Sequence, residues 1–261
     1  REKMISITEI SSILAAQRRS FLDEGHVSVE VRRERLNRLA RAILGHEAEL
    51  VSAFQVDYAN RSPFITRAFD ILGTVAAIEY HLAHFEDWMK PETVVLPTNG
   101  ITAEVHFQPL GVLGAIIPWN GPVLMGCLAA MGGISAGNRV MLKMSELAPA
   151  TGIAFAAAIE AEFDATEVAV INGDASVAAE FSRQPFDHLL FTGSTATGRK
   201  VAEAAAKNLV PVTLELGGKS PVVVGKSADL SLVANRLVAG KLSSAGQVCV
   251  APDYVLVPTG S

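Results

Sequence analysis

The sequence has 261 residues and a formal net charge of -5, with 49% hydrophobic and 19% charged residues. This balance is typical of a globular protein of one large or two ordinary domains, and the lack of a long basic run argues against nucleic acid as a partner. Cys127 and Cys249 are the only cysteines, which is too few for a secreted disulfide framework or for zinc-ligand pairs, so we expect a reducing compartment and no metal.

Two segments bear on targeting and membranes. Residues 1–20 have charges at helical spacing and lack the apolar core of a signal peptide. Residues 107–138 contain neither a charged residue nor a histidine, but PWNGP at 118–122 interrupts them, and the two remaining pieces are each too short to cross a bilayer. We expect a buried strand, a loop and a buried helix here, and a cytoplasmic protein without a membrane span.

Helical periodicity dominates the first hundred residues. Residues 28–50 place leucine and isoleucine on one face and arginine on the other, with Ser28 as a plausible start. A second helix is predicted over roughly residues 64–88, and Pro91 closes it. The alternating sequence ITAEVHFQ, at 101–108, then predicts a half-exposed strand.

From residue 111 short apolar runs alternate with alanine-rich helical stretches. The predicted strands are residues 111–118, 139–144, 167–172, 188–193 and 212–216, and the predicted helices are residues 122–135, 149–162, 175–183 and 196–207. Strict alternation favours parallel neighbours joined by helical crossovers, with helices on both faces of a buried sheet. The sequence therefore predicts an α/β fold with a doubly wound parallel sheet, a Rossmann-like domain of the nucleotide-binding type with N-terminal helices, over residues 1–216.

After Gly217 the pattern loosens. A strand at 221–224, a helix at 229–242 and a strand at 254–257 surround the cysteine turn SSAGQVCVAP. We expect residues 217–261 to begin a second α/β domain, which carries the turn.

The loop after the fourth predicted strand reads FTGSTATGRKV. Gly193 and Gly198 have the spacing of the first and last glycines of a phosphate-binding loop, but the lysine comes one place late and valine follows it. An ATP-binding module is thus a disfavoured alternative. A turn that opens a helix still offers free backbone N–H groups to an anion, so we expect Ser194 and Thr195 to help bind a phosphate.

The loop after the second predicted strand, KMSE, places Lys143 and Glu146 where dinucleotide-binding proteins keep partners for the adenosine ribose. Glu146 can accept hydrogen bonds from ribose hydroxyls, whereas Lys143 can bind a hydroxyl or a 2′-phosphate. The pair therefore leaves NAD and NADP both open.

Cys249 lies in a small, glycine-bearing turn, and no histidine follows it in the chain, which disfavours a papain-like hydrolase. His81 and His84 fit the polar side of a helix better than a metal site. Glu215 is the strongest candidate base, because the apolar strand around it disfavours the charged carboxylate. A simple ion pair between Glu215 and Lys219 is the structural alternative.

Five motifs, in order, resemble those of the aldehyde dehydrogenase superfamily. They are PWN (118–120), KMSE (143–146), FTGSTATG (191–198), LELGGKSP (214–221) and GQVCVAPDYVLV (246–257). The last motif and the motif separations are most similar to the class 3 branch, which includes fatty and aromatic aldehyde dehydrogenases, and to its bacterial coniferyl aldehyde type.

The resemblance implies that residues 1–216 are an NAD(P)-binding domain and that residues 217–261 begin the catalytic domain that carries the nucleophile. It also implies a mechanism. The Cys249 thiolate would attack an aromatic or long-chain aldehyde to give a thiohemiacetal, with the Asn120 amide and the Cys249 N–H holding the oxyanion. Hydride would pass to NAD or NADP, and Glu215 would activate the water that hydrolyses the thioester to the acid. Trp119 would join the cofactor-binding residues.

The sequence also departs from the family pattern. Met144 replaces a proline in the lysine motif, and Gly121 replaces a bulky residue after PWN. The family's later E-x-F-G-P motif and its dimerising C-terminal strands do not occur in these residues, although the family implies a homodimer. We therefore expect this chain alone to lack turnover, and a nucleotide-binding piece without activity is an alternative.

Overall fold

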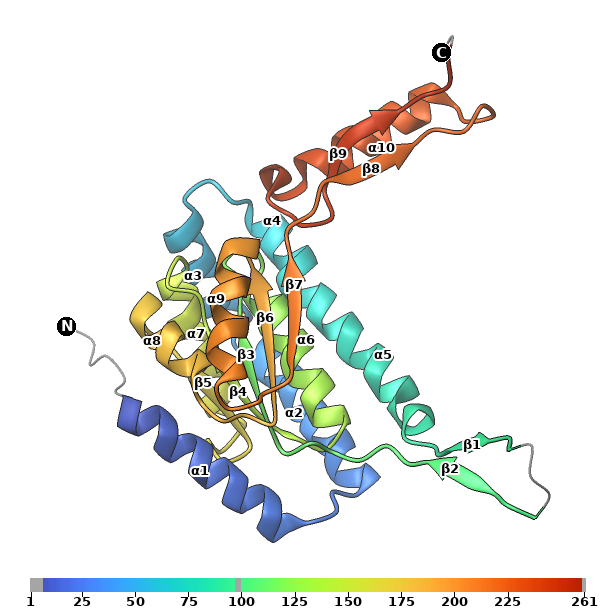
Figure 1. Cartoon of the computed structure of the whole chain (residues 1–261). Helices are drawn as coiled ribbons and strands as arrows, with labels where there is room; N and C mark the ends of the chain where they lie inside the picture. The colour runs from blue at the N-terminus through green and yellow to red at the C-terminus, as the bar shows by residue number, and fades with distance from the viewer. Residues whose placement is uncertain (1–6, 97–99, 260–261) are drawn as a thin grey trace.

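The computed structural model describes residues 7–96 and 100–259, and their centre is a five-stranded sheet (Figure 1). Its strands are β3 (Val112–Ile116), β4 (Arg139–Lys143), β5 (Val168–Ile171), β6 (His188–Gly193) and β7 (Val212–Leu216). They lie in the order β5-β4-β3-β6-β7 and all neighbours are parallel. Each predicted strand of the alternating region is present, which confirms the parallel α/β fold.

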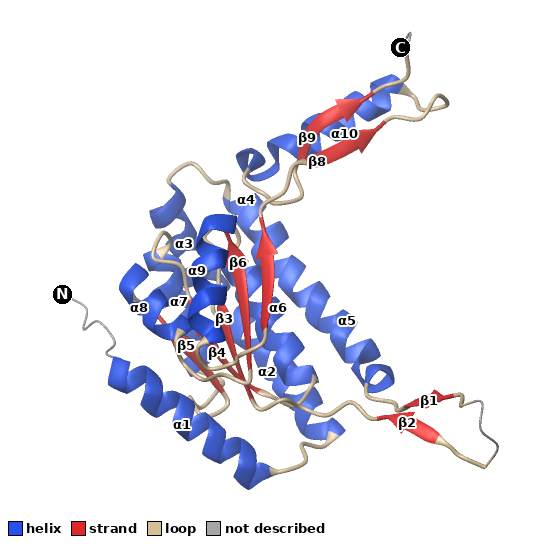
Figure 2. Cartoon of the chain, in the orientation of Figure 1, coloured by secondary structure: helices blue, strands red, loops and turns tan. Residues whose placement is uncertain are grey.

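Helices cover both faces of this sheet (Figure 2). They are α1 (Ile7–Glu24), α2 (Val29–Gly45), α3 (Glu47–Tyr58), α4 (Pro63–Ile65), α5 (Gly73–Trp88), α6 (Pro122–Ser135), α7 (Pro149–Glu160), α8 (Ala175–Ser182) and α9 (Thr195–Ala206). Ser28 caps α2 by accepting a hydrogen bond from the Val31 N–H, as the sequence predicts. Pro122 and Pro149 occupy first-turn positions, where proline loses no helical hydrogen bond.

Two apolar cores result, one on each face of the sheet. The larger core joins the strands to α2, α3, α5, α6 and α7, and the smaller core joins them to α1, α8 and α9. Successive residues of β3 serve both cores, because Ala115 belongs to the larger and Ile116 to the smaller. Burial of the strands on both faces explains why their sequences are continuously apolar rather than alternating.

The sequence predicts a single helix over roughly residues 64–88. The structure instead divides this region into separate helical segments. A π-helical segment, Thr66–Leu72, separates α4 from α5. Within it the carboxylate of Asp70 is buried, with 1% of the residue exposed, whereas Phe69 and Leu72 are exposed. This inverts the usual burial order of these residue types, and π-helical turns occur frequently at functional sites.

Residues 92–94 and 103–105 form a two-stranded antiparallel ribbon that projects from the body (Figure 1). Its strands are β1 (Glu92–Val94) and β2 (Ala103–Val105), and most of their residues are exposed. The strand expected over residues 101–108 is therefore present but shorter.

Residues 218–259 form a separate small layer beyond the end of β7 (Figure 1). It contains β8 (Ser220–Val223), α10 (Leu230–Leu242), a 3₁₀ turn (Ser243–Gly246) and β9 (Pro252–Leu256), with β8 parallel to β9. Apolar residues such as Val223, Val238 and Leu256 are exposed on this layer. The elements match those expected for the start of a second domain, and the division of the chain into two domains stays a prediction.

Glu167 joins the N-terminal helices to the start of β5. Its carboxylate accepts hydrogen bonds from Arg35 Nε at 2.8 Å and Arg38 Nη2 at 2.6 Å. Burial alone would raise the pKa of Glu167, but the hydrogen bonds from Arg38 and Arg35 together hold that pKa below its usual value. A lowered pKa means that this group stabilises the fold above the pKa of the unfolded chain and loses that effect as the pH falls.

We expect Glu167→Gln to lower the free energy of unfolding at pH 7 by about 2 kcal/mol, because the three hydrogen bonds that its carboxylate accepts from Arg35 and Arg38 lose a charged acceptor. The difference from the unsubstituted protein should shrink as the pH falls through the range where Glu167 is protonated. Urea unfolding at several pH values measures both effects. Glu34→Gln, in the exposed pair with Arg41, is the control and should leave the midpoint unchanged; an equal loss in both variants would contradict the assignment.

Candidate active site

A cavity of about 540 Å³ lies where the carboxyl ends of β3, β6 and β7 meet the cysteine turn. Residues from the loop after β4 complete it. The predicted site residues that line it are Trp119, Asn120, Glu146, Gly193, Ser194 and Cys249. Parallel strands place their carboxyl ends at one edge, which explains how four distant segments of sequence reach one cavity.

Asn120 bridges the turn after β3 and the cysteine turn. Its Nδ2 donates a hydrogen bond to the carbonyl of Gln247 at 2.8 Å, two residues before Cys249. An amide nitrogen carries two hydrogens, so one remains to be donated into the cavity. The contact fixes the distance between the two turns.

Cys249 is exposed, whereas Cys127 lies buried in α6. Burial raises the pKa of the Cys127 thiol, and the charge of Asp70 adds to this effect. Within residues 7–96 and 100–259, the backbone N–H of Cys249 donates no hydrogen bond. A free thiol and a free N–H therefore lie together at the cavity.

The backbone around the cysteine turn is tightly constrained. Ser244, Ala245 and Gly246 all have positive φ angles, of 49°, 55° and 76°. A Cβ atom added to Gly218 would lie 2.9 Å from the carbonyl oxygen of Cys249, so only glycine permits this approach. Both features bring the turn close to the end of β7.

Glu215 does not have the apolar surroundings that the sequence predicts. It lies on β7, an edge strand whose alternate residues Thr213 and Glu215 are exposed. The edge strand has a neighbour on one side only, and the face carrying Glu215 is uncovered in the described chain. The alternative ion pair is also absent, because Lys219 pairs with Asp253 at 2.7 Å.

Lys143 is buried rather than presented to a ligand. Its Nζ donates to the carbonyls of Met144 at 2.6 Å and Gly173 at 2.8 Å, and burial lowers the pKa of this amine. These contacts join the carboxyl ends of β4 and β5. Lys143 does not line the cavity, whereas Glu146 is exposed within it.

The start of α9 places the two residues that the sequence predicts to bind a phosphate. Ser194 Oγ accepts a hydrogen bond from the Thr197 N–H, and Thr195 begins the helix. Gly198 is buried, and a Cβ atom there would lie 3.0 Å from the Leu216 side chain. Gly198 therefore serves close packing of helix against strand, while Gly193 and Ser194 line the cavity.

Three residues at the site, Tyr58, Arg61 and Asp70, belong to none of the five sequence motifs. The hydroxyl of Tyr58 donates to the carbonyl of Trp119, and Arg61 Nη1 donates to the carbonyl of Asn120 at 3.2 Å. Arg61 also pairs with Asp70 at 2.6 Å. They precede the turn by about fifty to sixty positions, and local sequence patterns carry no signal for such partners.

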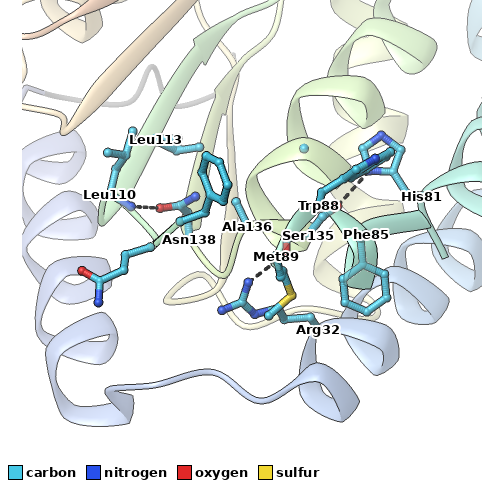
Figure 3. A pocket seen from close by; sticks show the side chains of 13 residues that line it. Arg32, His81, Phe85, Trp88, Met89, Leu110, Leu113, Ser135, Ala136 and Asn138 are labelled. Carbon is cyan, nitrogen blue, oxygen red and sulfur yellow. Dashed lines mark hydrogen bonds between the residues drawn. The ribbon is translucent and has the colours of Figure 1, made fainter. Parts of the chain in front are cut away.

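A second cavity, of about 450 Å³, lies between α2, α5 and α6 (Figure 3). Arg32 and His81 both contact Ser135 there, through Arg32 Nη1 to the carbonyl at 3.0 Å and His81 Nδ1 to the hydroxyl at 2.8 Å. None of the predicted site residues lines it. Among the residues that the structure places, no cluster of metal-ligating side chains occurs and no helix is long and apolar enough to cross a membrane.

Comparison with known proteins agrees with this geometry. The profile of the Aldehyde dehydrogenase family matches residues 4–261. The chain belongs to the aldehyde dehydrogenase family.

Particular relatives refine the placement. The chain is 45% identical to a coniferyl aldehyde dehydrogenase of a Pseudomonas species over 98% of its own length and 53% of the relative's. It is 37% identical to aldehyde dehydrogenase family 3 member H1 of Arabidopsis thaliana, over 98% and 53%. The chain thus spans about half the length of the curated relatives it matches.

Solved structures share the fold. Staphylococcus aureus AldH in a substrate-bound state superimposes with a TM-score of 0.88 at 32% identity, covering 96% of this chain and 55% of that one. An NAD+ complex of a Bacillus cereus aldehyde dehydrogenase gives a TM-score of 0.85 at 27% identity, covering 98% and 52%. Both support the arrangement of sheet and helices described above.

We expect mild alkylation at neutral pH to label Cys249 on the order of 10²-fold faster than Cys127, because Cys127 is reached only when the core opens. Peptide mass mapping over time measures the two rates. Cys249→Ser should leave only the slow reaction. Equal rates in the folded protein would show that Cys249 is not the accessible thiol.

Proposed function

We propose that the protein containing this chain oxidises an aldehyde to the carboxylic acid at Cys249, with NAD as the hydride acceptor. The observation that carries the proposal is the convergence of the exposed Cys249 thiol and the Asn120 amide on one cavity at the carboxyl edge of the sheet. The relatives named coniferyl aldehyde dehydrogenase support an aromatic aldehyde as the substrate class.

The residues of this chain account for the covalent steps. The Cys249 thiolate attacks the aldehyde carbon and forms a thiohemiacetal, and the free N–H of Cys249 with the second amide hydrogen of Asn120 binds the oxyanion. Both donors are neutral and fixed in place before reaction. The bound dinucleotide supplies the acceptor for the hydride that leaves the carbon. Glu215, which is not among the described residues that line the cavity, takes its role in this proposal from the family motif: it accepts a proton from the water that attacks the Cys249 thioester, which releases the acid and the thiol.

The cavity lining supports NAD over NADP. Glu146 is an exposed carboxylate there, suited to accept hydrogen bonds from ribose hydroxyls and to repel a 2′-phosphate. No lysine or arginine occurs among the described residues that line the cavity. The start of α9, with Ser194 as its cap, offers free backbone N–H groups to the pyrophosphate.

Titration calorimetry with NAD, NADP and ATP tests the cofactor. We expect NAD to bind more tightly than NADP, and Glu146→Ala to weaken NAD binding roughly tenfold through loss of the ribose contacts. Glu180→Ala, which removes a partly exposed carboxylate of α8 outside the cavity, is the matched control. Preferential binding of ATP would replace the proposal with a different nucleotide-binding function.

Asn120→Ala tests the oxyanion site in the full-length protein. The variant should lower the rate of NADH formation from an aromatic aldehyde by on the order of 10²–10³, since one of two donors is removed. Steady-state kinetics should show the loss mainly in kcat, because the contact strengthens as the oxyanion forms. Turnover close to that of the unsubstituted enzyme would remove Asn120 from the reaction.

A further inference from the structure

A buried ion pair lies directly behind the turn that carries Asn120. Asp70, in the π-helical segment, accepts hydrogen bonds from Arg61 Nη2 at 2.6 Å and from the Leu124 N–H at 3.2 Å. The side chains of Arg61 and Asp70 are 10% and 1% exposed. Burying two charges is costly, so a pair kept in this place calls for a role beyond stability.

The guanidinium of Arg61 is held on several sides. It lies over the Phe54 ring at 4.9 Å from the centroid and near the Tyr58 ring at 5.7 Å. Its Nη2 contacts Asp70, and its Nη1 donates to the carbonyl of Asn120 at 3.2 Å. Removal of the Asp70 charge would therefore release a group that holds the backbone of the catalytic amide.

The contacts continue from there to the cysteine turn. Arg61 holds the main chain of Asn120, and the Asn120 side chain donates to Gln247, two residues before Cys249. Tyr58 holds the preceding carbonyl, that of Trp119. A continuous series of hydrogen bonds thus runs from Asp70 to the turn that presents the thiol.

We propose that Asp70 and Arg61 are positioning residues of the active site, which hold the Trp119–Asn120 turn and through it the Cys249 turn, and that protonation of Asp70 loosens both turns. The catalytic part of this inference rests on the proposed function. The positioning itself is a property of this chain and can be measured without turnover.

The ionisation of Asp70 falls in an accessible range. Burial raises the pKa of Asp70 to about 6, although Arg61 and the N–H groups of Leu124 and Val123 oppose the rise. The ionisable groups that face it are Arg61, Tyr58 of α3 and Cys127 of α6, and burial raises the pKa of both Tyr58 and Cys127. Asp70 is therefore the member of this cluster that changes charge between pH 5 and 7.

The direction in which pH changes stability distinguishes loosening of the turns from unfolding of the chain. A raised pKa in the folded state means that protonation of Asp70 favours the folded chain as the pH falls through about 6. The protonated oxygen is a poorer acceptor for Arg61, so the change is local to the turn. Loosening at mildly acid pH should accordingly occur without loss of helix content.

Trp119 fluorescence reports on the turn. In a Trp88→Phe background Trp119 is the only tryptophan. Trp119 lines the active-site cavity and a neighbouring cavity bordered by Tyr58 and Arg61, and no histidine is among the described residues that line either one. We expect its emission to titrate with a midpoint near pH 6 while circular dichroism stays constant. Asp70→Asn in the same background should abolish the titration, and a midpoint that persists there would overturn the role of Asp70.

The rate of Cys249 alkylation at pH 7.5 reports on the cysteine turn. Asp70→Asn and Arg61→Met should each change the rate roughly three- to tenfold, and Arg61→Lys should recover part of the difference. Arg67→Gln, which breaks an exposed pair on the same π-helical segment, should leave the rate unchanged. Unchanged rates in folded Asp70 and Arg61 variants would overturn the proposal.

The positioning role of Asp70 and the proposed dehydrogenase function can each be refuted independently of the other. If Asp70→Asn does not fold, the fluorescence titration of the Trp88→Phe protein decides the matter, because a flat profile between pH 5 and 7 overturns the proposal. NAD binding measured on the same samples tests the proposed function. If Asp70 affects the two turns but the protein does not bind NAD, this inference stands and the dehydrogenase assignment is refuted. If the protein binds NAD but the fluorescence titration is flat, the dehydrogenase assignment stands and this inference is overturned.

Discussion

The site depends on one constraint, which is that the turn between β3 and α6 leaves a buried strand with its backbone carbonyls pointing into protein rather than water. Buried carbonyls need partners. Tyr58 and Arg61 supply them for Trp119 and Asn120, and Asp70 supplies an acceptor for an N–H in the first turn of α6. The N-terminal helices are therefore a structural part of the active-site edge rather than an addition to the sheet.

The site joins the edge of a buried sheet to a turn that is anchored on it. The strands are fixed by parallel ladders and two apolar cores, and the cysteine turn meets them through the Asn120 amide and the close approach of Gly218. Both proposed oxyanion donors, the Asn120 amide and the Cys249 N–H, are thereby held in place before reaction.

Much of this arrangement can be predicted from the sequence, because apolar strands buried on both faces leave continuous runs and helix starts leave capping serines such as Ser28 and Ser194. Loops that follow parallel strands must share an edge, so Asn120, Glu146 and Ser194 can be grouped in advance. The burial of Lys143 and the exposure of Glu215 could not be predicted from the sequence, since both depend on which neighbours cover a strand end. Asp70 is hidden for another reason, because a π-helical turn breaks the 3.6-residue periodicity that sequence patterns rely on.

The three consecutive left-handed residues at the start of the cysteine turn, Ser244, Ala245 and Gly246, restrict how this protein can vary. Glycine adopts that conformation freely, whereas serine and alanine at positions 244 and 245 do so at a cost of about 1 kcal/mol each. Valine, isoleucine or threonine would cost more, because branching at Cβ crowds the backbone there. Few residue types are therefore tolerated at positions 244 and 245. Among folded variants from a library of random substitutions there, we expect mainly glycine, asparagine, aspartate, serine and alanine.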